Sequence, residues 1–195
     1  MKILKTSLIA CIVQFVAAQT HAQLRFPVTN NELRNNLEKI IKDFSNQLNS
    51  IKGDTLARNP QTIEYTTVLK FDGAEQNTIT QYISTKPIYS WEALMLTTED
   101  FAAAEKKYKW LCNQLKVMTI NMGNGYTFSL SGRYEAPVES KGFSTSTFQL
   151  TPAATYLPRL KIEVSMQFYF PEWKVNLTVY QREREDHERG DINEE

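Results

Sequence analysis

The strongest constraint on the fold is a strict alternation of apolar and polar residues in two segments near the end of the chain. In residues 160–170 and 173–179 every second side chain is apolar, and most of those between are charged, amide or hydroxyl side chains. Successive side chains of a strand point to opposite faces, so this pattern is typical of strands with one buried face. Pro171-Glu172 predicts a tight reversal between them. We therefore expect an antiparallel hairpin with one polar face.

Two other segments repeat apolar residues at steps of three and four, as amphipathic helices do. The first helix is expected to begin after Thr29, whose hydroxyl can cap it, and to end at Gly53. The second is expected to begin near Thr97 and to end before Gly123. Five further segments have the composition or the alternation of strands, namely residues 62–71, 78–84, 88–96, 126–134 and 144–150.

These elements predict an α+β fold with two layers. Two amphipathic helices are expected to pack on one face of a mainly antiparallel sheet of six to seven strands. A shift of 67 positions aligns seven identical residues of the two helices, among them Glu38 with Glu105 and Leu48 with Leu115. This agreement suggests an internal α-β-β-β duplication. Frequent use of the same few helix-forming residues explains it equally well.

The first 22 residues have the features of a signal peptide. Lys2 and Lys5 precede an apolar run over residues 8–18, and Ala22 is a small residue at a cleavage position. We expect a mature chain that begins at Gln23, has no transmembrane segment and is secreted or periplasmic, because the apolar run is too short to span a bilayer. The alternative is a lipoprotein acylated at Cys11, but the apolar run continues past that residue.

The remaining chain divides into a body and a charged tail. Residues 23–181 have 17 basic and 15 acidic residues and are expected to form a single α+β domain. Residues 182–195 are mostly charged and are expected to be mobile. A nearly neutral body has no basic surface for nucleic acid, so we expect no such partner.

The chain offers few side chains for catalysis or metal binding. From Gln23 onward it has one cysteine, Cys112, and one histidine, His187, which lies in the tail. We therefore predict no catalytic, cofactor-binding or metal-binding residues. A glycan hydrolase needs only two carboxylates. Its candidates are Glu64, Glu92, Glu135, Glu139 and Glu163, which the pattern predicts to be solvated charges.

The polar face of the sheet is the candidate binding surface, because hydroxyl, amide and tyrosine side chains on a flat face can bind glycans or proteins. The same pattern is typical of a solvated sheet face. The function expected is non-enzymatic binding of a protein, glycan or small apolar ligand. A carrier or chaperone for an apolar ligand and a carboxylate-dependent glycan hydrolase are the alternatives. The residues chosen are Arg133, Lys161, Gln167, Tyr169, Lys174 and Tyr180.

Three short motifs carry a resemblance to other proteins. Ile51-Lys52-Gly53 at the end of the first helix, and Lys106-Lys107-Tyr108-Lys109 and Gln114-Leu115 in the second, resemble segments of uncharacterised secreted proteins from Gram-negative bacteria. The resemblance covers the two helices and implies a location in the cell envelope. It implies no activity.

Overall fold

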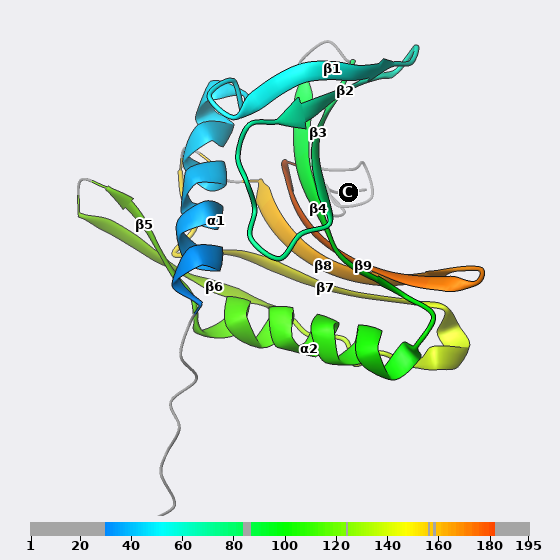
Figure 1. Ribbon diagram of the computed structural model, residues 1–195. Helices are drawn as coiled ribbons and strands as arrows, with labels where there is room; N and C mark the ends of the chain where they lie inside the picture. The colour runs from blue at the N-terminus through cyan, green and yellow to red at the C-terminus, as the bar shows by residue number, and fades with distance from the viewer. Residues whose placement is uncertain (1–29, 84–86, 124, 156, 158, 182–195) are drawn as a thin grey trace, which may run out of the picture.

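The computed structural model describes residues 30–83, 87–123, 125–155, 157 and 159–181, and folds them into one nine-stranded antiparallel sheet with two α-helices (Figure 1). The order across the sheet is β1-β2-β3-β4-β9-β8-β7-β6-β5, so β9 joins two groups of consecutive strands. Two short 3-10 helices are also present. The elements in chain order are α1 (Asn31–Asp43), η1 (Phe44–Asn46), β1 (Lys52–Arg58), β2 (Thr62–Thr67), β3 (Gln76–Tyr82), β4 (Ile88–Thr98), α2 (Phe101–Val117), β5 (Thr119–Gly123), β6 (Tyr126–Arg133), η2 (Glu139–Lys141), β7 (Phe143–Thr151), β8 (Leu160–Tyr169) and β9 (Glu172–Gln181).

The predicted fold class is wrong, because the described residues form a β-rich structure with nine strands rather than a two-layer fold with six or seven. The two strands that the prediction missed, β1 and β5, are the edges of the sheet. An edge strand has one unpaired side and little buried surface, so it needs no apolar alternation. The predicted α-β-β-β repeat is also wrong, since four strands follow α1 and five follow α2.

The helices do not form a layer that covers the sheet. In Figure 1, α1 and α2 run crosswise to one another. Helix α2 contacts the central strands β4, β8 and β9 and also β6, whereas the strand that α1 mainly contacts is the edge strand β5. The predicted layer of two helices packed on one face of the sheet is therefore replaced by one helix against the central strands and one whose main strand contact is the edge strand β5.

Helix α1 ends at Asp43, ten residues before the predicted stop at Gly53, because a different signal ends it. The Asp43 carboxylate accepts hydrogen bonds from the backbone N–H groups of Ser50 (2.9 Å) and Ile51 (3.2 Å). These bonds hold a turn in which Gln47 and Leu48 have the left-handed backbone conformation that usually favours glycine (φ 56° and 57°). Gly53 lies in β1 instead. At the other end, the side chain of Asn30 caps α1 by accepting from Glu32 and Leu33.

The predicted hairpin of residues 160–179 is confirmed as β8 and β9, which pair from Leu160 and Gln181 to Tyr169 and Glu172. Its apolar side chains belong to a single cluster of buried hydrophobic residues that also includes both helices. Full burial of each such side chain contributes about 1.5–3 kcal/mol. The buried residues of the hairpin are Leu160, Ile162, Val164, Met166, Trp173, Val175, Leu177 and Val179.

Two predicted segments, the signal peptide and the charged tail, lie outside the described residues. Within the described part of the chain, neither helix has the length and apolar character needed to cross a membrane.

Candidate functional site

The face of the sheet opposite the apolar core carries a groove of about 500 Å³, which we call the polar groove. It lies over β3, β4, β9 and β8, at the centre of the strand order. Short hydroxyl side chains at Thr78, Thr80 and Ser90 line it together with longer side chains. The residues that line it are Thr78, Thr80, Tyr82, Ile88, Tyr89, Ser90, Glu92, Glu163, Thr178, Tyr180 and Gln181.

Two carboxylates face each other across β9 in the polar groove. Glu92 on β4 and Glu163 on β8 are both paired with Thr178 of β9, so the three residues form one row across three strands. Adjacent strands lie about 4.8 Å apart, which puts the backbones of the two glutamates about 10 Å apart. Thr178 donates to Glu92 Oε2 (3.3 Å) and Tyr180 donates to Glu163 Oε2 (3.1 Å). Both carboxylates are therefore held by hydroxyls of the strand between them.

The surroundings of Glu92 disfavour its charged form. Glu92 is exposed but lines the groove, where the surrounding protein atoms remove part of the water from its carboxylate. This desolvation raises the pKa of Glu92, the hydrogen bond from Thr178 lowers it, and the negative charge of Glu163 raises it further. The net effect is a pKa above the ordinary value for glutamate. The neutral, protonated form of Glu92 is thus more favourable than it would be for an isolated surface glutamate.

A smaller hollow of about 290 Å³ adjoins the polar groove and shares Thr78 and Glu92 with it; we call it the side groove. It adds the ammonium group of Lys174, which lies 5.8 Å from the centre of the Tyr169 ring. This geometry is that of a cation–π contact. The two hollows together place negative charge at the centre of the sheet and a positive charge toward the β8–β9 turn.

The six residues chosen from the sequence divide into two groups. Tyr180 lines the polar groove, and Tyr169 and Lys174 line the side groove. The other three line neither hollow. Lys161 donates to Gln149 of β7 (3.0 Å), Gln167 pairs with Lys174 in the β8–β9 ladder, and Arg133 pairs with Thr147 at the end of β6.

Thr78, Thr80 and Ser90 were not expected at a binding surface, and the sequence pattern predicted both glutamates of the groove to be solvated charges. Thr78, Thr80 and Tyr82 alternate along β3, so their common face could have been read from the sequence. The pairing of β4 with β9 could not, because Glu92 and Thr178 are 86 residues apart. Only this pairing brings Glu92 and Glu163 together.

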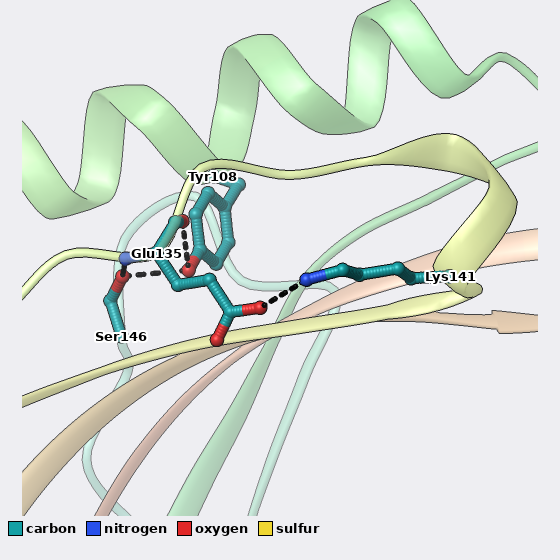
Figure 2. Close-up of polar contacts among 4 residues, drawn as sticks. All are labelled: Tyr108, Glu135, Lys141 and Ser146. Atoms are coloured by element: carbon teal, nitrogen blue, oxygen red, sulfur yellow. Dashed lines mark hydrogen bonds and ion pairs between the residues drawn. The ribbon is translucent and has the colours of Figure 1, made fainter.

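A second group of polar side chains lies in the interior, between α2 and the sheet (Figure 2). Tyr108 donates to the carbonyl of Glu135 (3.1 Å) and is 2.7 Å from the hydroxyl of Ser146, which accepts from the N–H of Glu135 (2.9 Å). Burial raises the pKa of Tyr108 and keeps its hydroxyl protonated. The Lys141–Glu135 ion pair beside it is exposed and contributes little. Because these groups satisfy one another, the cluster is structural.

Cys112 lies next to this cluster and is fully buried. Burial raises the pKa of its thiol to about 11, so the nucleophilic thiolate is scarce at neutral pH. Within the residues that the structure describes, no three side chains of histidine, cysteine, aspartate and glutamate gather as metal ligands would.

Comparisons with known proteins add no relative, since no protein-family model, no curated protein and no solved structure matches the chain.

Proposed function

We propose that the protein is exported and binds a polar ligand, such as a glycan, in the polar groove without chemical change to it. The observation that carries this proposal is the groove of about 500 Å³ on the polar face of the sheet, which is within the size range of small-ligand sites. Its lining supplies hydroxyl groups, two carboxylates and the ring of Tyr180. Hydroxyls and carboxylates are the acceptors and donors that sugar hydroxyls require.

A variant that fills the groove tests this proposal. Thr80→Trp places a large side chain on β3 inside the polar groove, and we expect it to weaken binding of a soluble oligosaccharide at least tenfold. The matched control is Thr127→Trp on β6, an exposed threonine that does not line the groove, with affinity expected within twofold of the wild type. Isothermal titration calorimetry against a panel of oligosaccharides measures both. Equal affinities for the two variants would refute a site in the groove.

The second candidate function is a glycan hydrolase, and the carboxylate pair favours it. Glycosidases use an acid with a raised pKa and a second carboxylate, with the two carboxyl groups about 5–9.5 Å apart. Glu92 has the raised pKa, and side chains that lean over β9 from backbones about 10 Å apart can meet at such a separation. The same titrations distinguish the two functions when the solution is assayed for new reducing ends. If new reducing ends are released, and if Glu92→Gln and Glu163→Gln each abolish that release, the function is hydrolysis rather than binding.

The apolar carrier receives less support than either candidate. Its ligand would lie between the helices and the sheet. That space is occupied by a cluster of buried hydrophobic side chains, in which Leu37, Leu111 and Leu177 are fully buried. The polar groove lies on the opposite face and has hydroxyls and carboxylates in its walls.

Export is tested separately from binding. We expect protein recovered from the producing cell's envelope or medium to begin at Gln23, because Ala22 and the apolar run of residues 8–18 form a cleavage signal. Intact-mass spectrometry measures the N-terminus directly. A diacylated N-terminus at Cys11 would establish a lipoprotein, and an uncleaved chain that starts at Met1 would contradict export.

A further inference from the structure

The polar groove carries negative charge that the described residues do not neutralise. The ion pairs among them are Lys42–Glu38, Lys109–Glu105 and Lys141–Glu135, and all lie elsewhere. Glu92 and Glu163 instead accept hydrogen bonds from the neutral hydroxyls of Thr178 and Tyr180. Two carboxylates in one hollow repel each other unless a positive charge lies between them.

Among the described residues, the two lysines of β8 and β9, Lys161 and Lys174, have other partners. Lys161 precedes Glu163 on the same face of β8, but its ammonium group donates to Gln149 on the far side, at 3.0 Å. Lys174 lies in the side groove over the ring of Tyr169. Neither forms an ion pair with Glu92 or Glu163.

The other side chains of the groove are better suited to an ammonium group on a polar ligand than to a bare metal ion. Thr78, Thr80 and Ser90 supply hydroxyl oxygens that can accept N–H bonds, and Tyr82 and Tyr180 supply aromatic rings. Amines bind carboxylates through charge-assisted hydrogen bonds and bind aromatic rings through cation–π contacts. Among the residues that the structure describes, no three histidine, cysteine, aspartate and glutamate side chains gather as metal ligands would.

We propose that the ligand of the polar groove carries a positively charged amine, which binds between Glu92 and Glu163. The inference rests on the proposed function and adds the chemical class of the ligand, an amine-bearing glycan. The negative charge of Glu163, which contributes to the raised pKa of Glu92, also attracts a cation to the space between the two carboxylates.

Two probes of equal length test the inference: an oligomer of glucosamine, which has free amines, and an oligomer of N-acetylglucosamine, in which each amine is an uncharged amide. They are titrated into the full-length protein at a pH where the free amines are charged. We expect the glucosamine oligomer to bind at least tenfold more tightly, and this difference to shrink as salt is added. Equal affinities, or tighter binding of the acetylated oligomer, would overturn the amine inference and leave the proposed groove function intact. Binding of neither oligomer would also overturn the amine inference, and the panel of oligosaccharides would then decide the proposed groove function.

Charge variants locate the amine. Glu92→Gln and Glu163→Gln keep the size of each side chain, and each is expected to weaken binding of the glucosamine oligomer about tenfold more than it weakens binding of the acetylated oligomer. The control Glu99→Gln removes an exposed carboxylate between β4 and α2 and should leave both affinities unchanged. Lys174→Gln removes the positive charge of the side groove and should strengthen binding of the glucosamine oligomer. Equal effects of the Glu92, Glu163 and Glu99 variants would mean that the amine binds elsewhere, which contradicts the inference. Unchanged melting temperatures of the free variants show that each one folds.

Discussion

Leu111→Ala is expected to lower the free energy of unfolding by about 2–5 kcal/mol, the usual range for a leucine removed from a core. Leu111 is in the middle of α2 and is fully buried. Helix α2 contacts β4, β6, β8 and β9, so a cavity at its centre removes contacts with several strands at once. Equilibrium denaturation in urea measures the change through the midpoint at constant slope.

Lys106→Ala is the matched control on the same helix, because Lys106 is exposed. It is a better control than Lys107, which is half-buried with its ammonium group 5.2 Å from the centre of the Trp110 ring. Burial lowers the pKa of Lys107, so the lysines of α2 are not all equally solvated. The assignment of the buried face of α2 would be wrong if Leu111→Ala and Lys106→Ala had the same midpoint.

Gly132→Ala is expected to lower the free energy of unfolding by about 3 kcal/mol or more, at the top of the range for overpacking. Gly132 in β6 is paired with Phe148 in β7. A β-carbon at this position would overlap the carbonyl oxygen of Thr147 and would lie 2.7 Å from the α-carbon of Phe148 and 2.8 Å from its ring. Two of these three atoms belong to the backbone, so the strands would have to separate to make room.

Gly53→Ala provides the comparison for this prediction. The β-carbon added at Gly53 would overlap the side-chain oxygen of Thr66, which can rotate away, and its distance to the Thr66 carbonyl oxygen would be 3.3 Å. Alanine is also favoured over glycine within a strand by about 0.5–1 kcal/mol. We expect a change of less than about 1 kcal/mol. Thermal or chemical denaturation that gave equal losses for both variants would contradict the close approach of β6 and β7.

The local pattern of apolar and polar residues predicted the helices and strands that bury one face. The β8–β9 hairpin follows from alternation over twenty residues, because each apolar side chain of residues 160–166 and 173–179 is buried. The helix in residues 101–117 follows from its spacing of apolar residues in the same way. The edge strands β1 and β5 have weaker patterns because less of their surface is buried. The predicted end of α1 was wrong, because the Asp43 carboxylate and not a glycine holds the turn that follows the helix.

The candidate site could be predicted only in part, because two of the strands that form it, β4 and β9, lie far apart in the sequence. The polar face of the hairpin, with Lys174 and Tyr180, follows from alternation. The partner strand β4 does not, since pairing between strands about 80 residues apart leaves no local signal in either of them. Glu92 and Glu163 therefore look like separate surface charges in the sequence and become neighbours across β9 only through tertiary pairing.

The position of β9 between β4 and β8 has a consequence for the order in which the sheet can assemble. Strands β1 to β4 and β5 to β8 each pair with sequence neighbours, so either group can form from local contacts soon after it is synthesised. Until β9 pairs, β4 and β8 both present open edges with exposed backbone N–H and C=O groups. Open edges can pair with other chains. The nascent protein thus has an interval of vulnerability to aggregation that ends only when the last of the nine strands inserts and closes the centre of the sheet.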